Sequence, residues 1–405
     1  MPQFIASVVT IIVAANVILL SVAYLILLER KIASWVQDRI GPNRVGFDFG
    51  QSFLPKFHFW GLGQPLADGL KFLLKEDYTP DGVDKPLFIL SPILAVIPAV
   101  VGWAVIPWGG WLKWGDSVLS ICAAPVDIGV IYILAVSSMA VYGVVVGGYA
   151  SNSKYSFLGG LRATAQMLSY EVPLGLCVLT VILVSGTARP DLLVHLQVGA
   201  TNGLWNLCRM PALAVIFFIC NLAETNRAPF DLPESEQELV GGYHTEYSSM
   251  KFALFFLGEY MHMITAAAFF TTLFLGGWSV NPIGLGPDLP LIGGLGLVVL
   301  KFAVYAGKIF LMLSLMMMVR WTLPRFRFDQ LMSLAWRALV PITLSLLLVT
   351  GALWYFHQQA WWMLCGANAL VVLAVIVLSP LIPAGAPVNR RVPLVGSRFS
   401  APRAT

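Results

Sequence analysis

Nine long apolar segments constrain this chain more than any other feature of its sequence. A helix of about 20 apolar residues spans the hydrocarbon core of a bilayer. The composition agrees, because 58% of the residues are hydrophobic and only 11% are charged. The segments lie near residues 4–28, 87–106, 127–147, 163–185, 211–224, 252–277, 296–319, 337–356 and 361–379. We therefore expect an all-α polytopic membrane protein.

The basic residues predict how these helices are oriented. Of the 25 Lys and Arg residues, 20 lie in the C-terminal tail and in the loops that follow odd-numbered segments, whereas 3 lie in the opposite loops. By the positive-inside rule the N-terminus is outside and the tail is cytoplasmic. We expect eight core transmembrane helices and a ninth at the C-terminal end. The expected divisions are a membrane domain at 1–356, an additional transmembrane helix at 357–380 and a basic tail at 381–405.

The first cytoplasmic loop contains an amphipathic pattern. Leu66, Leu70 and Leu73 fall on one helical face, and Asp68 and Lys71 fall on the other. This pattern is typical of a helix that lies in the membrane interface. Such a helix either frames an opening for a lipid-soluble molecule or serves as a surface anchor, and the anchor is the commoner case.

The same loop begins with a charged group at the end of the first apolar segment. Glu29 and Arg30 are followed by Asp38 and Arg39, with Asp68 further along. Long basic side chains near a helix end often extend to the headgroup level, which is one interpretation. The other is that these charges line a polar chamber. The spacing does not decide between the two.

The third cytoplasmic loop is acidic although its side of the membrane is otherwise basic. A single base, Arg227, stands among Glu224, Asp231, Glu234, Glu236, Glu238 and Glu246. Carboxylates held close together raise each other's pKa, which suits them to carrying protons near neutral pH. An acidic run is also a common solvated surface. We favour the proton-carrying interpretation because Pro and Phe residues interrupt the run, and because it follows the fifth helix directly.

Several ionisable residues are predicted at bilayer depth, where each costs about 2.5–3.5 kcal/mol on insertion scales. They are Glu171, Glu224, Glu259 and Lys308. Tyr142 adds a hydroxyl that can pass a proton without carrying charge. Lys301, Tyr305 and Lys308 share one stripe of the seventh helix, which we expect to face the bundle. We interpret these groups as a hydrophilic path, with helix packing as the alternative.

The chain shows no pattern of metal ligands. Its five cysteines contain no CxxC pair, and we interpret them as packing residues. Glu259 and His262 have the spacing of half a di-iron site, but a second copy is missing, so we predict no metal. A Gly-rich dinucleotide turn is also missing, so the sequence shows no dinucleotide site on this chain.

The chain resembles the H subunit, also called subunit 1, of proton-pumping NADH:quinone oxidoreductase, respiratory complex I. The resemblance runs from about residue 5 to 356. It rests on the stretches ERKIASWVQDRIGPNRVG, GQPLADGLKFLLKED, GGYASNSKYSFLGGLRATAQMLSYEVPLG, AETNRAPFDLPESEQELVGGYHTEYS with GEYM, and LPRFRFDQLM. Agreement in five separate places makes chance implausible.

The resemblance implies a subunit of a proton-translocating enzyme complex that has no complete redox site of its own. Its expected partners are the hydrophilic-arm subunits near the terminal iron-sulfur cluster, the pumping subunits of the membrane arm, quinone and lipid, with no nucleic acid. NADH, FMN and the iron-sulfur clusters would be on partner subunits. The resemblance assigns quinone binding to Arg30, Arg39, Gln64, Asp68 and Lys71. It assigns the proton path to Tyr142, Glu171, Glu224, Glu234, Glu236, Glu259 and Lys308.

Three departures from the family pattern stand out. The insert at 47–60 is longer than usual, His262 stands where we expect an amide or a small polar residue, and the ninth helix with its tail lies beyond the family core. Two other functions remain open: the equivalent membrane subunit of a proton-pumping hydrogenase, and a stand-alone proton-coupled carrier. The carrier predicts inverted repeats, which the sequence does not show. A bacterial plasma membrane is the expected location.

Overall fold

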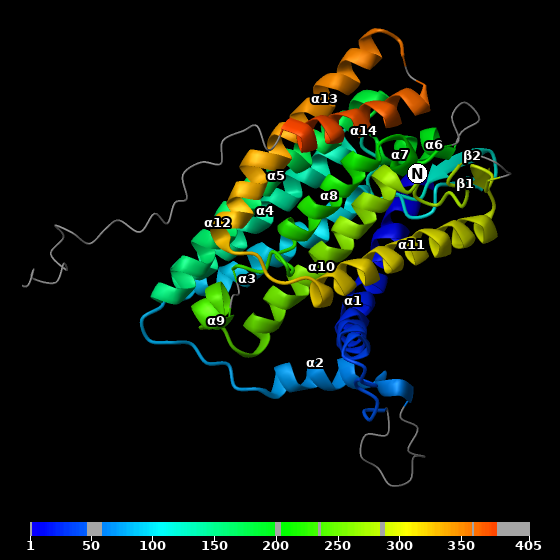
Figure 1. Ribbon diagram of the computed structural model, residues 1–405. Helices are drawn as coiled ribbons and strands as arrows, with labels where there is room; N and C mark the ends of the chain where they lie inside the picture. Colours follow the sequence, from blue (N-terminus) through cyan, green and yellow to red (C-terminus); the bar gives the residue numbers. More distant parts are fainter. Residues whose placement is uncertain are drawn as a thin grey trace, which may run out of the picture.

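A computed structural model of the chain shows a bundle of long helices with a small sheet at one end (Figure 1). The structure describes residues 2–46, 59–198, 204–233, 236–283, 288–358 and 360–378. The predicted tail at 381–405 and most of the insert at 47–60 lie outside these ranges. The helices are α1 (Pro2–Val36), α2 (Gln64–Leu74), α3 (Lys85–Val101), α4 (Gly129–Ala150), α5 (Lys154–Ser185), α6 (Pro190–Val198), α7 (Asn206–Arg209), α8 (Pro211–Glu224), α9 (Glu236–Leu239), α10 (Ser249–Phe274), α11 (Leu295–Thr322), α12 (Phe328–Ser333), α13 (Val340–Tyr355) and α14 (Trp361–Leu378).

The expected all-α polytopic class is confirmed. Within the described ranges, seven helical segments are long and apolar enough to cross a membrane: Pro2–Val36, Lys85–Val105, Gly129–Ala150, Lys154–Ser185, Ser249–Phe274, Leu295–Thr322 and Phe328–Tyr355. Two further apolar helices, α8 and α14, are shorter. Each predicted segment therefore coincides with a helix, while the number that crosses the membrane remains a prediction.

Two helices are longer than the sequence predicts. α1 continues past Glu29 and Arg30 to Val36, so that its 35 residues extend about 52 Å, well beyond the bilayer core. α5 begins at Lys154 rather than near residue 163. Its first turns pack closely on the turn at Gly242–His244, because a Cβ on Gly159 would lie 2.7 Å from the Tyr243 nitrogen. Tertiary packing thus extends the helix into a polar stretch.

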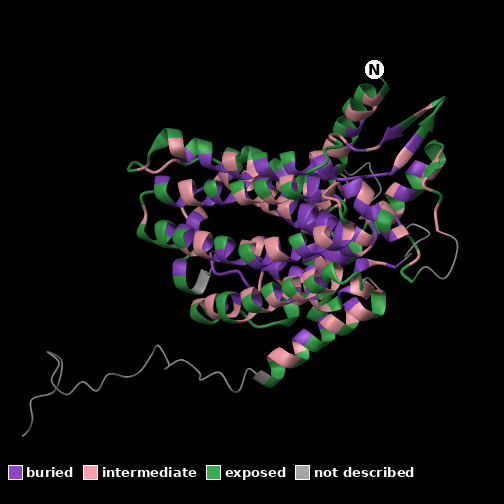
Figure 2. Cartoon of the chain, turned by 90° about the horizontal axis from the view of Figure 1, so that it is seen from above, coloured by how far each residue is buried: buried purple, intermediate pink, exposed green. Residues whose placement is uncertain are grey.

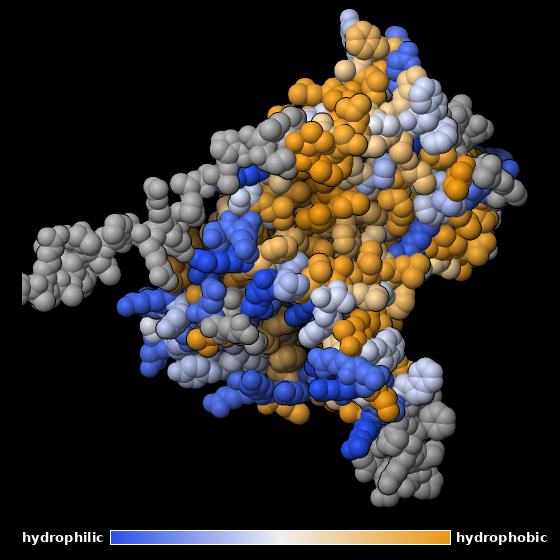
Figure 3. Space-filling view, viewed as in Figure 1, coloured by the Kyte–Doolittle hydropathy of each residue, from blue (hydrophilic) through white to orange (hydrophobic). Residues whose placement is uncertain are grey.

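The predicted amphipathic helix is α2, which crosses one end of the bundle beneath α1 and α10 (Figure 1). Pro65 occupies its first turn, where a missing N–H is tolerated. Leu66, Leu70, Leu73 and Leu74 are exposed, so this apolar face is free to meet lipid. We call this the α2 end of the molecule, and hydrophilic residues gather there (Figure 3).

The opposite end carries a small sheet that the sequence did not predict. Strand β1 (Trp111–Trp114) pairs antiparallel with β2 (Ser117–Ser120) and parallel with β3 (Ile292–Gly293), in the order β2-β1-β3. The three strands are too short for an alternating pattern to be recognised. They connect the loop before α4 to the loop before α11, and we call this the sheet end.

The helices α3, α4, α5 and α10 pack closely together, and the largest group of buried apolar residues lies along α5, α8, α10 and α11. Buried residues concentrate toward the inside of the bundle (Figure 2). A Cβ on Gly143 of α4 would lie 2.7 Å from the Ala95 nitrogen of α3, so only glycine permits this approach. Small residues at helix contacts allow such close packing in membrane proteins. This rigid group of helices supports the polar side chains described next.

Candidate functional site

A cluster of charged side chains is buried near the α2 end. Glu29 of α1 forms ion pairs with Arg227, at 3.3 Å, and with Arg320 of α11. Arg227 also approaches Glu259 of α10 at 3.6 Å. The Tyr260 hydroxyl donates a hydrogen bond of 2.6 Å to Glu29. We call these five residues the ionic cluster.

Mutual pairing explains how these charges tolerate burial. Glu29 is 7% exposed and Arg227 is 5% exposed. An isolated charge at such a position would be strongly destabilising, whereas paired charges with further hydrogen bonds are tolerated. Arg227 also stacks over the Tyr260 ring, 4.4 Å from its centre, which adds a cation–π contact. The cluster therefore joins α1, α10, α11 and the loop after α8.

A buried glutamine fixes the loop that carries Arg227. Gln166 of α5 donates hydrogen bonds of 2.8 Å and 2.7 Å to the carbonyl oxygens of Ala223 and Phe230. Asn221 of α8 donates to the Ala266 carbonyl oxygen of α10 at 3.1 Å. These contacts bond carbonyl oxygens at the end of α8, in the loop and on α10, and they hold the loop against the bundle.

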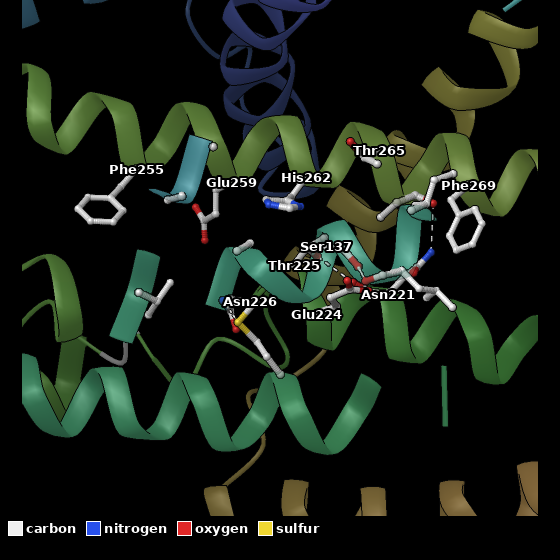
Figure 4. A pocket seen from close by; sticks show the side chains of 18 of the residues that line it. Ser137, Asn221, Glu224, Thr225, Asn226, Phe255, Glu259, His262, Thr265 and Phe269 are labelled. Carbon is white, nitrogen blue, oxygen red and sulfur yellow. Dashed lines mark hydrogen bonds between the residues drawn. The ribbon is translucent and has the colours of Figure 1, made fainter. Parts of the chain in front are cut away.

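A small cavity lies beside the ionic cluster (Figure 4). Its volume is about 60 Å³, enough for a few water molecules. The polar groups that line it include side chains from α4, α8, α10 and the loop that follows α8. They are Ser137, Asn221, Glu224, Thr225, Asn226, Glu259, His262 and Thr265. We call it the acid cavity because Glu224 and Glu259 share it.

Glu224 connects the acid cavity to a third carboxylate. Ser137 hydrogen-bonds Glu224, and Glu171 of α5 is close enough to interact with it electrostatically. The Ser138 hydroxyl donates a hydrogen bond to Glu171. The structure thus brings together three of the predicted path residues, Glu171, Glu224 and Glu259.

A second polar group lies between α1 and α2, at the place where the sequence predicts quinone binding. Arg30 pairs with Asp68 at 2.9 Å, and the Gln64 amide donates to Asp68 at 3.1 Å. We call Arg30, Gln64 and Asp68 the mouth group. Arg39 and Lys71 are exposed, and within the described ranges neither forms an ion pair with it. Glu29, the neighbour of Arg30, points into the ionic cluster. One turn of α1 therefore contributes a residue to each of the two groups.

The far end of α2 is fixed to the start of α10. The Ser249 hydroxyl donates to the carbonyl oxygens of Phe72, at 2.9 Å, and Lys75, at 3.0 Å. Lys251 pairs with Asp77 at 3.1 Å. These contacts hold α2 across the bundle and keep the mouth group near the ionic cluster.

The other acids of the third loop differ in their surroundings, and Asp231 alone among them is buried and interacts electrostatically with Glu259 of the ionic cluster, within the described residues. Asp231 pairs with Arg325 at 3.1 Å, and Glu238 pairs with Arg162 at 2.6 Å on the surface. Glu234 lies outside the described residues, and the side chain of Glu236 is likewise not described. In the same loop, burial among aromatic rings lowers the pKa of His244 to about 4. The acidic run is therefore not one cluster.

Two predicted path residues lie away from the acid cavity. Tyr142 is 63% exposed on the outer surface of α4. Lys308 does face the bundle, but near the sheet end. Its ammonium group donates to the carbonyl oxygens of Leu275 and Ser279, both at 2.5 Å, and lies 4.0 Å from the centre of the Trp205 ring system.

Lys301, in the same stripe of α11, is fully buried. Its ammonium group donates to the Leu291 carbonyl oxygen at 2.7 Å. The predicted inward direction of the stripe is confirmed. Within the described residues, both ammonium groups hydrogen-bond backbone oxygens and lie near Trp rings, and the Asp288 carboxylate is close enough to attract both electrostatically.

Comparison with known proteins decides the family. The family model described as NADH dehydrogenase matches residues 9–351. The chain belongs to the family of NADH-quinone oxidoreductase H subunits. It is 43% identical over 350 residues to the NADH-quinone oxidoreductase H subunit 1 of Cytophaga hutchinsonii, a match that covers 85% of this chain and 95% of that protein.

Other members of the H-subunit family are similar to this chain at comparable identity and coverage. Identity is 46% over 349 residues to the H subunit 2 of Koribacter versatilis, covering 83% of this chain and 93% of that protein. It is 45% over 339 residues to the H subunit of Rickettsia typhi, covering 84% and 91% respectively. The matched region of the family model ends within α13, so α14 lies beyond it.

Sequence reasoning missed the basic members of the ionic cluster. Arg227 stood out only as the single base of an acidic loop, and Arg320 only as a topology determinant. Their common partner Glu29 is 198 and 291 residues away along the chain. The signal in the sequence is Glu29 itself, because a Glu at the end of an apolar helix requires a cation close by.

Proposed function

We propose that this chain forms the quinone-binding chamber of an NADH:quinone oxidoreductase and couples quinone reduction to proton translocation. The observation that carries the proposal is the succession of polar groups from the mouth group through the ionic cluster to the acid cavity. Arg30 of α1 belongs to the mouth group, and its neighbour Glu29 belongs to the ionic cluster. Glu259 belongs to the ionic cluster and also lines the acid cavity. The names of the relatives support quinone as the substrate.

The proposed mechanism is electrostatic. Reduction of a quinone to a quinol takes two electrons from the iron-sulfur clusters of partner subunits and two protons. Protons drawn from nearby side chains change the charge near Arg30 and Asp68. Arg227 lies between the carboxylates of Glu29 and Glu259, so a change in its pairing with one alters its attraction to the other. Glu259 faces Glu224 across the acid cavity, and Glu224 interacts with Glu171. The chain thereby transmits the reduction as a redistribution of protons toward pumping subunits.

Other members of the enzyme complex supply what this chain lacks in the proposal. NADH, FMN and iron-sulfur clusters belong to hydrophilic-arm subunits, and the antiporter-like subunits of the membrane arm move the protons. The N-terminus lies outside and the tail in the cytoplasm of a bacterial plasma membrane, so that α2 faces the hydrophilic arm. This orientation follows the distribution of basic residues. Arg39, Lys71, Tyr142, Glu234 and Glu236 remain predicted members of the two sites. The resemblance also assigns Lys308 to the proton path, but its hydrogen bonds to backbone oxygens favour a structural role.

The substitution Glu224→Gln tests the proposal. It keeps the shape and hydrogen-bonding capacity of the side chain but removes its ability to ionise. We expect the complex to assemble while NADH:quinone reductase activity and proton uptake by membrane vesicles fall sharply. The matched control is Glu238→Gln, the same change at an exposed carboxylate of the same loop, which should leave both activities intact. Wild-type activity in an assembled Glu224→Gln complex contradicts the proposal.

A further inference from the structure

His262 has no part in the function proposed above, yet it lines the acid cavity. It follows Glu259 by three residues on α10, and this spacing places both side chains on the cavity-facing stripe of the helix. In Figure 4 the imidazole lies between Glu259 and Glu224. The sequence pattern of the family does not account for a histidine here, because we expect an amide or a small polar residue.

One nitrogen of His262 lacks a protein partner. Its Nε2 is fully buried, and no hydrogen bond to it is made by any residue that the structure describes. Leaving such a group unpaired costs about 1–3 kcal/mol, so buried polar groups in native proteins nearly always have a partner. The imidazole lines the acid cavity, which is the space where such a partner would lie.

The acid cavity has the size and the lining that water requires. Its volume of about 60 Å³ accommodates a few water molecules. Buried waters usually form two to four hydrogen bonds, and about three is typical. The carboxylates of Glu224 and Glu259 and the amides of Asn221 and Asn226 offer these bonds from opposite walls. A neutral imidazole contributes one donor and one acceptor, so it extends a chain of waters in either direction.

We infer that His262 anchors a short chain of water molecules that connects Glu259 to Glu224. This inference rests on the proposed function, in which protons move between these two carboxylates. His262 is a positioning residue here: it holds water by hydrogen bonding, and the protons pass along the waters. The ionic cluster, which holds Glu259, and the Glu224–Glu171 pair then form one continuous route.

Three substitutions in the intact complex test this role. His262→Leu keeps an apolar side chain of similar bulk but removes both hydrogen-bonding atoms. His262→Gln keeps a donor and an acceptor without an imidazole. Thr271→Val is the matched control further along α10, because the buried Thr271 hydroxyl donates to the Ala267 carbonyl oxygen at 2.8 Å in the same way but does not line the cavity.

The measurements are NADH:quinone reductase activity, proton uptake by membrane vesicles and the amount of assembled complex. We expect His262→Leu to lower both activities at least about tenfold, a modest value for the loss of a proton-transfer contact. His262→Gln should retain most of the activity, and Thr271→Val should match the wild type. A purely structural histidine would not give this rescue by glutamine.

The outcomes separate this inference from the proposed function. If His262→Leu keeps wild-type activity while Glu224→Gln loses it, the water chain is wrong and the proposed function stands. If the leucine and glutamine variants lose activity equally although both assemble, anchoring by hydrogen bonds is wrong. If Glu224→Gln keeps wild-type activity, the proposed function fails, and the inference about His262 fails with it.

Discussion

Two regions of this molecule bury ionisable side chains at membrane depth, and they do so differently. Near the α2 end, Glu29, Arg227, Glu259 and Arg320 neutralise one another and adjoin the acid cavity. Near the sheet end, Lys301 and Lys308 bind backbone carbonyl oxygens and lie over Trp rings. Carbonyl oxygens and Trp rings do not titrate, and the Asp288 carboxylate, which attracts both ammonium groups, forms no ion pair with either of them among the described residues. A buried charge is therefore a candidate for proton transfer when its partners also titrate, and a candidate for fold stabilisation when they do not.

The position of Lys308 fits the second case. Leu275 follows the last residue of α10, so the ammonium group meets the carbonyl oxygens that this helix end leaves without an intrahelical partner. A cation is favourable at a helix C-terminus because the helix dipole is negative there. Ser279, the other acceptor, belongs to the following loop. Lys308 thus fixes the end of α10 that lies farthest from α2.

The largest expected effect comes from removing the shared cation of the ionic cluster. Arg227→Met preserves much of the side-chain volume but deprives Glu29 and Glu259 of a common partner. Breaking a buried pair in this way typically costs about 3–5 kcal/mol. We expect little assembled complex in the membrane, measured on native gels. Arg162→Met is the control, since Arg162 pairs with the exposed Glu238 on the surface, away from the cluster. Normal assembly of Arg227→Met would remove the distinction drawn between the two regions.

A smaller effect is expected for Lys308→Met. Hydrogen bonds from a charged group contribute about 1.5–3 kcal/mol, so the variant complex should lose activity at a lower temperature in a heat-inactivation series. Its quinone reduction and proton uptake per assembled complex should equal those of the wild type. Lys308→Arg should recover part of the heat resistance. Normal heat resistance with abolished proton uptake would instead assign Lys308 to the proton path, as the sequence predicts.

The smallest effect on stability is expected at the mouth group. The side chains of Arg30 and Asp68 are 46% and 18% exposed, so solvent screens their attraction. A double-mutant cycle with Arg30→Ala and Asp68→Ala should give a coupling energy of about 0.2–1 kcal/mol in thermal unfolding. Both single variants should raise the KM for quinone, measured in steady-state kinetics. A coupling energy as large as that of the buried pairs would show that the mouth group belongs to the ionic cluster.

The sequence predicted the helices well because apolar length is a local property. All nine apolar segments coincide with helices, and the leucine pattern at 66–74 marked α2 correctly. The predicted start of α5 was wrong because packing overrides composition there. The first turns of this helix are polar, yet Gly159 lets them pack against Tyr243. The three short strands depend on pairing between residues 111–120 and 292–293, which no local pattern reveals.

The site residues were predictable to the extent that burial alone marked them. Glu171, Glu224 and Glu259 were conspicuous as acids within apolar segments, and the fold brings them together. The two partners of Glu29 were not predictable, because a pairing over such distances along the chain leaves no periodic signal. Glu29 itself was considered only with Asp38 and Asp68, and the structure instead joins Asp68 to Arg30.

The length and continuity of α1 have a mechanical consequence. Glu29 and Arg30 are neighbours on one uninterrupted 35-residue helix, and their side chains leave its axis about 100° apart. A rotation of the helix about its axis therefore turns both side chains through the same angle at the same moment. Any twist of α1 that pulls Arg30 from Asp68 also displaces Glu29 relative to Arg227 and Arg320. Because Glu29 and Arg30 are joined by one peptide bond, α1 couples the mouth group mechanically to the ionic cluster.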